Sequence, residues 1–233
     1  MNSPLMTQPL FFAGPVPITA PVVVTWMILI LVTVLARLAT RSLTLVPSTA
    51  QAVVETMIGA MDTQINETMQ TDPGPYRALI GTIFIYVLVA NWSSLVPGIE
   101  PPTAHLETDA ALALIVFCAT ILYGVRSRGF AGYLKTFAEP SWVMIPLNLV
   151  EQVTRTFSLV VRLFGNVMSG VFIVGIILSL AGLLVPIPLM ALDLLTGAVQ
   201  AYIFAVLSSV FIGAAVGERR TSSQTAYQEP DTP

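Results

Sequence analysis

The stretch Ser158–Asn166, with the sequence SLVVRLFGN, places one arginine in the middle of an apolar run. From Ile145 to Leu184 the only other ionisable residues are Glu151 and Arg155. A guanidinium keeps its proton and costs several kcal/mol to place in lipid. Arg162 therefore indicates a function in ion transport, whereas the structural alternative is an arginine that snorkels to the membrane surface or pairs with another group.

The composition is that of a membrane protein. Hydrophobic residues make up 55% of the chain and charged residues 10%, and the mean hydropathy is +0.81, whereas a soluble domain carries about 25% charged residues. The sequence predicts an all-α polytopic membrane protein with one membrane domain over residues 1–233. A net charge of -3 with scattered basic residues excludes a nucleic-acid partner. A single cysteine, Cys118, excludes an internal disulfide, and we expect it to be buried.

Apolar runs divide the chain into expected membrane segments. Spans are predicted over residues 21–38, 76–96 and 110–125, and a long helical hairpin over residues 145–216. Residues 43–69 alternate apolar and polar positions at helical spacing, which predicts an amphipathic helix on the cytoplasmic surface that ends at Asp72–Pro75. The polar residues 221–233 are expected to be a disordered tail.

Charge at the ends of the spans sets the expected orientation. The chain has no basic residue before Arg37, so residues 21–38 lack the leading charge of a signal peptide and are expected to remain as a first span. The segment Ile99–Asp109 contains acidic residues and His105 but no Lys or Arg. By the positive-inside rule, this segment and the N-terminus lie outside and the C-terminus is cytoplasmic. His105 is expected to have a surface role.

The segment 145–216 does not divide into ordinary spans. No proline occurs between Pro146 and Pro186, and a helix of about 36 residues is about 54 Å long, whereas the hydrocarbon core is about 30 Å thick. Such a helix must be strongly tilted and held by protein partners. Pro186 and Pro188 are expected to form the turn into a last helix from about Leu189. About five membrane helices result, and the last two form a long, strongly tilted hairpin.

Helical periodicity gathers the polar groups of the hairpin into two faces. At about 100° per residue, a sector of about 80° on the first of these helices holds Glu151, Arg155, Ser158, Arg162, Asn166 and Ser169, here called the polar stripe. On the last helix, Asp193 and Gln200 share a face with Gly197. Three structural alternatives stay open: a surface ion pair between Glu151 and Arg155, a helix N-cap at Asp193, and a plain interhelical hydrogen bond at Gln200.

The polar stripe and its flanks resemble the signature of subunit a of F-type ATP synthase. The resemblance is carried by Pro146–Glu151, Arg155, Ser158–Leu159 and Arg162–Asn166, and on the last helix by Gln200–Phe204 with a polar residue seven positions earlier. Weaker similarity occurs at Asn91–Gly98, at Pro102–Ala104, and at Pro47, Gln51 and Glu55. It extends over most of the chain.

The resemblance implies a stator subunit beside a rotating ring of c subunits. Arg162 would face the ion-carrying carboxylate of each c subunit between two offset aqueous half-channels, with Asn166, Asp193 and Gln200 on the ion path. The rest of the polar stripe, Glu151, Arg155, Ser158 and Ser169, would support it. Such a subunit is not an enzyme by itself and holds no cofactor or metal. The implied partners are the c ring, b-type peripheral stalk subunits and membrane lipid, in the inner membrane of a bacterium.

Two departures from the family pattern bear on the coupling ion. Many relatives have an acidic residue after the glycine that corresponds to Gly170, where this chain has Val171, and many have His or Glu where Asp193 stands. The usual relay pair is thus reduced to Asp193. Proton coupling is what the family implies, and Na⁺ is a rival because it needs an oxygen-lined path rather than titrating groups.

A second class of function is a self-contained ion or anion transporter or channel, in which Arg162 binds the substrate or acts as a gate. The sequence has neither an internal repeat nor a pair of broken helices that would favour it. An enzyme active within the membrane is disfavoured by the lack of zinc-binding and serine-nucleophile motifs.

Overall fold

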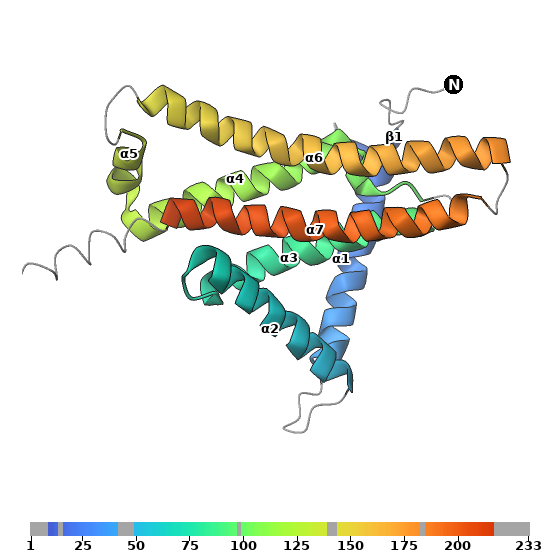
Figure 1. The fold of residues 1–233 in the computed structure, drawn as a ribbon, viewed down its shortest axis with the longest axis horizontal. Helices are drawn as coiled ribbons and strands as arrows, with labels where there is room; N and C mark the ends of the chain where they lie inside the picture. The colour runs from blue at the N-terminus through green and yellow to red at the C-terminus, as the bar shows by residue number, and fades with distance from the viewer. Residues whose placement is uncertain are drawn as a thin grey trace, which may run out of the picture.

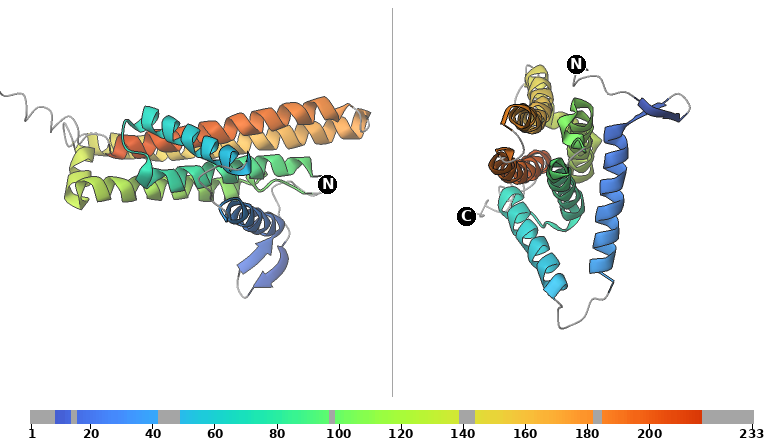
Figure 2. Two further views of the ribbon diagram at one scale, coloured as in Figure 1. Left: turned by 90° about the horizontal axis from the view of Figure 1, so that it is seen from below. Right: turned by 90° about the vertical axis from the view of Figure 1, so that its right-hand side faces the viewer.

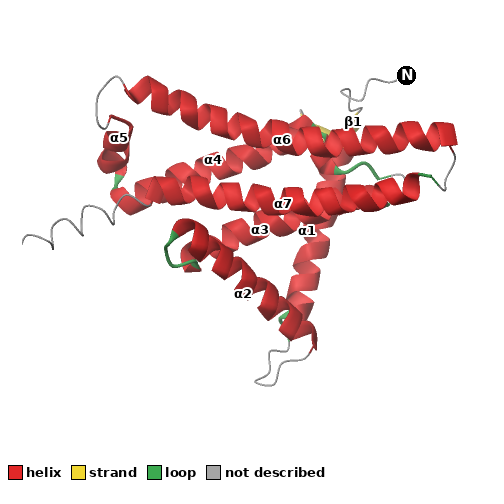
Figure 3. Ribbon diagram, viewed as in Figure 1, coloured by secondary structure: helices red, strands yellow, loops and turns green. Residues whose placement is uncertain are grey.

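The computed structural model describes residues 9–13, 16–41, 49–96, 99–138, 144–181 and 185–216 of the 233-residue chain. Five helices are long and apolar enough to cross a membrane (Figures 1 and 3): α1 (Ala20–Ala39), α3 (Gly74–Trp92, continued by a 3₁₀ turn Ser93–Leu95), α4 (Leu106–Arg128), α6 (Met144–Ala181) and α7 (Pro186–Val216). The prediction of an all-α polytopic membrane protein with about five membrane helices is confirmed.

A small β-hairpin, which periodicity did not predict, precedes α1. Strand β1 (Pro9–Ala13) pairs antiparallel with β2 (Val16–Thr19). Thr19 is extended, and Pro21 stands in the first turn of α1, where a missing backbone N–H costs no helical hydrogen bond. The first membrane helix therefore begins directly at the end of the hairpin.

Helices α6 and α7 run side by side and antiparallel along the longest axis of the molecule, whereas α1 crosses their direction (Figures 1 and 2). With 38 residues, α6 is about 57 Å long, nearly twice the thickness of the hydrocarbon core. The expected start of the last helix at Leu189 was wrong: α7 begins at Pro186, because prolines fit the first turn of a helix as readily as the turn before it.

The core lies where α3, α4, α6 and α7 meet. Val87 and Ala90 of α3, Ala113 of α4, Leu163 of α6 and Phe204 of α7 have no exposed surface. Small residues let the backbones approach closely. A methyl group on Gly197 of α7 would lie 3.1 Å from the Cβ atom of Asn91 on α3. In lipid such close packing replaces the hydrophobic effect as the source of helix association.

The amphipathic helix α2 (Thr49–Met69) lies against α3 and α7. Its second half packs on this body through Ile65 and Met69, whereas Val53 and Ile58 in its first half are exposed. Asp62 forms an ion pair with Arg77 of α3. This ion pair connects the two helices on either side of the Asp72–Pro75 turn. Residues 43–48 of the expected amphipathic segment lie outside the described residues.

A short helix α5 (Phe130–Ala138), absent from the sequence expectations, follows α4. Gly129 separates them with a φ of +76°, a left-handed conformation that glycine adopts without strain. Lys135 in α5 and Arg126 and Arg128 in the last turn of α4 form the basic end of this pair of helices.

The expectation that Cys118 is buried was wrong: its side chain is exposed on α4. In a membrane helix an apolar neighbourhood in the sequence is equally compatible with a lipid-facing position, so the burial habit of cysteine in soluble proteins does not transfer. The expected disordered tail, residues 221–233, lies outside the described residues.

Candidate functional site

Arg162 lies at the midpoint of α6 and on its exposed side. The opposite side of α6 packs into the core through Leu159, Val160, Leu163 and Val167, which are at most 8% exposed. These four positions recur at the three- and four-residue spacing of one helix face. The same periodicity that buries this face turns Arg162 and Ser158 away from it, so the side chain of Arg162 is presented to whatever surrounds the hairpin.

The polar stripe borders a groove of about 570 Å³ between α6 and α7. Glu151, Arg155, Ser158 and Arg162 line one wall, and Leu207 and Phe211 of α7 line the other. The structure thus brings four of the six stripe residues to one open surface.

The two arginines of the stripe differ in their partners. Arg155 forms an ion pair with Glu151 one turn away, and its guanidinium carbon lies 5.7 Å from the ring centroid of Phe211. Arg162 makes no hydrogen bond or ion pair with any residue that the structure describes. The local ion pair considered for Glu151 and Arg155 is therefore present. Arg162 is the basic side chain of the hairpin's described residues that has no ion-pair partner.

Asn166 and Ser169 continue the stripe beyond Arg162. The hydroxyl of Ser169 donates to the carbonyl of Asn166 at 2.9 Å. The amide nitrogen of Asn166 is buried and finds no acceptor among the described residues. A buried donor without a partner costs about 1–3 kcal/mol, so this amide is available to a water molecule or a partner.

Asp193 lies inside α7, two turns after its start at Pro186. The alternative of an N-cap at Asp193 was therefore wrong. The half-buried carboxylate accepts a long hydrogen bond of 3.4 Å from the hydroxyl of Ser94. It packs directly on Gly170 of α6, where a Cβ atom would lie 2.0 Å from one carboxylate oxygen. Gly170 thus makes the room that Asp193 occupies.

The contacts Gly170–Asp193 and Arg155–Phe211 fix the antiparallel register of the hairpin. In this register Gln200 lies level with residues 163–166 and hence with Arg162. Gln200 is 6% exposed, and its amide nitrogen has no partner among the described residues. The interhelical hydrogen bond considered for Gln200 is not formed by this donor.

A buried hydrogen-bonded network beside Gln200 was not predicted as part of the site. Asn91 of α3 donates to the carbonyl of Gly197 at 2.9 Å and accepts from the hydroxyl of Thr103 at 2.7 Å. Both side chains lie in the stretches of weaker family similarity, which was the only signal in the sequence. The network connects α3, the 3₁₀ turn Pro102–Ala104 and α7 at the level of the polar residues.

His105 is less exposed than its expected place in an outer loop implied, since its side chain is only 12% exposed. The 3₁₀ turn Pro102–Ala104 before it is buried, and it carries His105 toward α6. Asp109, expected in an outer loop, is fully buried in the first turns of α4, and neither carboxylate oxygen has a partner among the described residues. Within those residues no group of three His, Cys, Asp or Glu side chains could hold a metal ion.

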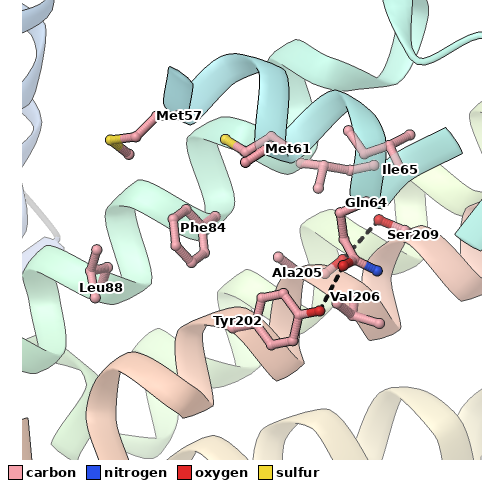
Figure 4. A pocket seen from close by; sticks show the side chains of 12 residues that line it. Met57, Met61, Gln64, Ile65, Phe84, Leu88, Tyr202, Ala205, Val206 and Ser209 are labelled. Atoms are coloured by element: carbon pink, nitrogen blue, oxygen red, sulfur yellow. Dashed lines mark hydrogen bonds between the residues drawn. The ribbon is translucent and has the colours of Figure 1, made fainter. Parts of the chain in front are cut away.

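A separate pocket of about 370 Å³ lies between α2, α3 and α7 (Figure 4). Its lining is almost entirely apolar, with Met57 and Met61 on one side and Phe84 on another. The hydroxyl of Tyr202 donates to the side-chain oxygen of Gln64 across it at 2.7 Å. No acidic or basic side chain lines the pocket, which lies apart from the polar stripe.

Comparisons with known proteins find relatives over most of the chain. The family model described as "ATP synthase A chain" matches residues 22–213. "ATP synthase subunit a 2" of a Bradyrhizobium strain is 53% identical over 216 residues, which cover 93% of this chain and 97% of the relative. "ATP synthase subunit a" of Albidiferax ferrireducens is 42% identical, covering 89% and 90%. "ATP synthase subunit a 2" of Acaryochloris marina is 43% identical, covering 87% of each chain.

Proposed function

The chain belongs to the family of ATP synthase subunit a, and on that premise we propose that it is the ion-translocating stator subunit of the membrane sector of an ATP synthase. Arg162 would be the charge that meets the ion-carrying carboxylate of each passing c subunit. One observation carries this proposal: Arg162 is exposed and without a partner among the described residues, at the midpoint of a helix about 57 Å long.

A fixed guanidinium at this position performs two tasks. It favours the ionised form of a facing carboxylate, which therefore releases its ion into the exit half-channel. It also repels a cation that would leak directly between the half-channels, because like charges interact strongly where water is scarce. Rotation of the ring then becomes the favoured route for the ion, and ion flow is coupled to ATP synthesis or hydrolysis.

The open surface beside Arg162 supports a protein partner. A lipid-facing guanidinium would be costly, whereas the groove lined by Glu151, Arg155 and Ser158 offers a polar wall to the c ring. In this arrangement the hairpin lies strongly tilted with the polar stripe against the ring. A self-contained transporter would instead enclose its substrate charge between its own helices, and the exposure of Arg162 disfavours that alternative.

The half-channels would be lined by Asn166, Asp193 and Gln200. Two buried donors without partners, in Asn166 and Gln200, support a hydrated path at the level of Arg162. The proposal includes proton coupling as the family default, with Na⁺ as the alternative ion. It further includes b-type stalk subunits as partners, an outside N-terminus and a cytoplasmic C-terminus in a bacterial inner membrane.

Replacing Arg162 tests the proposal. Arg162→Ala should abolish ATP synthesis driven by an imposed ion gradient in membrane vesicles, while the amount of assembled complex stays that of the wild type. Arg162→Lys should restore little, because lysine lacks the planar fork and sheds its proton when desolvated. Arg126→Ala, which removes an exposed arginine at the end of α4, is the matched control. Normal coupled synthesis by Arg162→Ala would overturn the assignment.

A further inference from the structure

The segment between α3 and α4 carries a histidine–carboxylate pair that the proposed function does not use. The imidazole Nε2 atom of His105 lies 3.5 Å from a carboxylate oxygen of Glu100. The two side chains differ in exposure: His105 is 12% exposed and Glu100 is 76% exposed. The Nε2 atom itself is buried and makes no hydrogen bond within the described part of the chain. The pair therefore reaches from the surface of the protein into its interior.

Two cavities meet at Glu100. One, of about 340 Å³, is lined by His105 and by the outer part of α6 as far as Ser179. The other, of about 160 Å³, is lined by Ser94 and Asp193. Both have Glu100, Val171 and Gly175 in their walls. Since one water molecule takes up about 30 Å³ of liquid volume, both cavities have room for several waters.

The wall that α6 contributes to these cavities is not ionisable. Val171 and Gly175 stand one turn apart on the helix, and from Val167 to Ala181 no residue is charged. The carboxylates of the path come from the facing side, from Glu100 and Asp193. The order along it is His105, Glu100, then Asp193 with Ser94.

We propose that Glu100 and His105 form the outer mouth of the ion path that leads to Asp193, supplying the ionisable groups that α6 lacks at Val171. The inference rests on the proposed function, because it assigns residues to one of its half-channels. Carboxylates spaced along a narrow cavity lower the electrostatic barrier to a cation, and imidazole passes protons near neutral pH. The structural alternative is an ion pair that only fastens the segment between α3 and α4.

Variants that replace each ionisable side chain with a neutral amide separate these two roles. Glu100→Gln and His105→Asn, in the complete ATP synthase in membrane vesicles, should slow ATP-driven ion pumping at least fivefold per assembled complex. The control is Glu107→Gln, an exposed acidic residue of the same region that lines neither cavity. A pair that only fastens the chain would lower the amount of complex and leave the rate per complex unchanged. Rates equal to that of the control would overturn the inference.

Two changes at Val171 provide a second readout. Val171→Glu places a carboxylate between the two cavities and should restore pumping to the His105→Asn variant, which a purely structural role of His105 cannot explain. Val171→Phe should narrow the path and slow pumping, whereas Ile173→Phe, at an exposed position of α6 that lines neither cavity, should not. Absence of both effects would refute the assignment of this path.

Failure of this inference can be told apart from failure of the proposed function by assaying Arg162→Ala in the same vesicles. If Arg162→Ala does not pump and the Glu100 and His105 variants match Glu107→Gln, the stator function stands and the outer mouth lies elsewhere. If Arg162→Ala pumps normally, the proposed function itself is wrong.

Discussion

The close contact between Gly170 and Asp193 allows a sharp prediction for Gly170→Ala. A methyl group on Gly170 would lie 2.0 Å from one carboxylate oxygen of Asp193 and 2.8 Å from its carboxyl carbon. Real Cβ atoms essentially never approach another heavy atom within 3.0 Å, so the oxygen must withdraw by at least about 1 Å. The carboxylate is the flexible end of its side chain, and we expect it to rotate away from Ser94 rather than to separate the helices.

Two opposing terms set the expected effect on stability. Overpacking a well-filled site costs about 1–3 kcal/mol, and alanine stabilises a helix by about 1 kcal/mol relative to glycine. The net destabilisation of about 0–2 kcal/mol leaves a folded subunit. The effect on ion flux should be larger, because displacing a functional group by about 1 Å can cost up to about 100-fold in rate. We expect flux per assembled complex to fall roughly 10- to 100-fold.

The assay is ATP synthesis driven by imposed H⁺ and Na⁺ gradients in vesicles, normalised to assembled complex. If Gly170→Ala acts only by displacing Asp193, then Gly170→Ala combined with Asp193→Asn should be no slower than Asp193→Asn alone, within about twofold. Gly59→Ala adds a methyl group to a helix where nothing lies within 4 Å and serves as control. Wild-type flux in Gly170→Ala, or multiplicative losses in the double variant, would refute the reasoning.

Asn91→Ala leaves the Gly197 carbonyl and the Thr103 hydroxyl buried without their partner. Each unsatisfied group costs about 1–3 kcal/mol of stability. The midpoint temperature of thermal unfolding of the complex should therefore fall clearly below that of the control Thr82→Ala, which changes an exposed residue. Cysteines at Ser158 or Ser169 should cross-link to the outer c-subunit helix and cysteines at Val160 or Leu163 should not, and equal yields from all four would contradict the proposed orientation. Tyr202→Phe removes one exposed hydrogen bond to Gln64 and should cost less than about 1.5 kcal/mol of stability, with ATP-driven ion pumping unchanged. A large loss of pumping would contradict this expectation and would indicate that the apolar pocket between α2, α3 and α7 has a role in ion transport.

The polar stripe could be predicted from the sequence because it belongs to a single helix. Once a helix is assumed, the angle between any two of its residues is fixed, so Arg162 and Ser158 had to share a face and Leu163 had to point elsewhere. The structure buries Leu163 completely and leaves Arg162 exposed. The expectation for Cys118 failed because it relied on the burial habit of free cysteine, which does not distinguish a lipid-facing from a protein-facing side of an apolar helix.

The remaining polar groups are brought together by tertiary packing, which helical periodicity does not describe. Glu100 and His105 stand in a segment whose charge pattern alone predicted exposure, yet the buried turn Pro102–Ala104 carries His105 to the wall of α6. Asp193 is partly enclosed because Gly170, far away in the sequence, lacks a side chain. The sequence shows that position 171 is valine rather than an acidic residue. Only the structure identifies Glu100 and His105 as the ionisable groups that face this part of α6 across the cavity. The outer mouth of the proposed ion path therefore depends on how several helices and the segment between α3 and α4 pack together. The position of Arg162 follows from the periodicity of α6 alone.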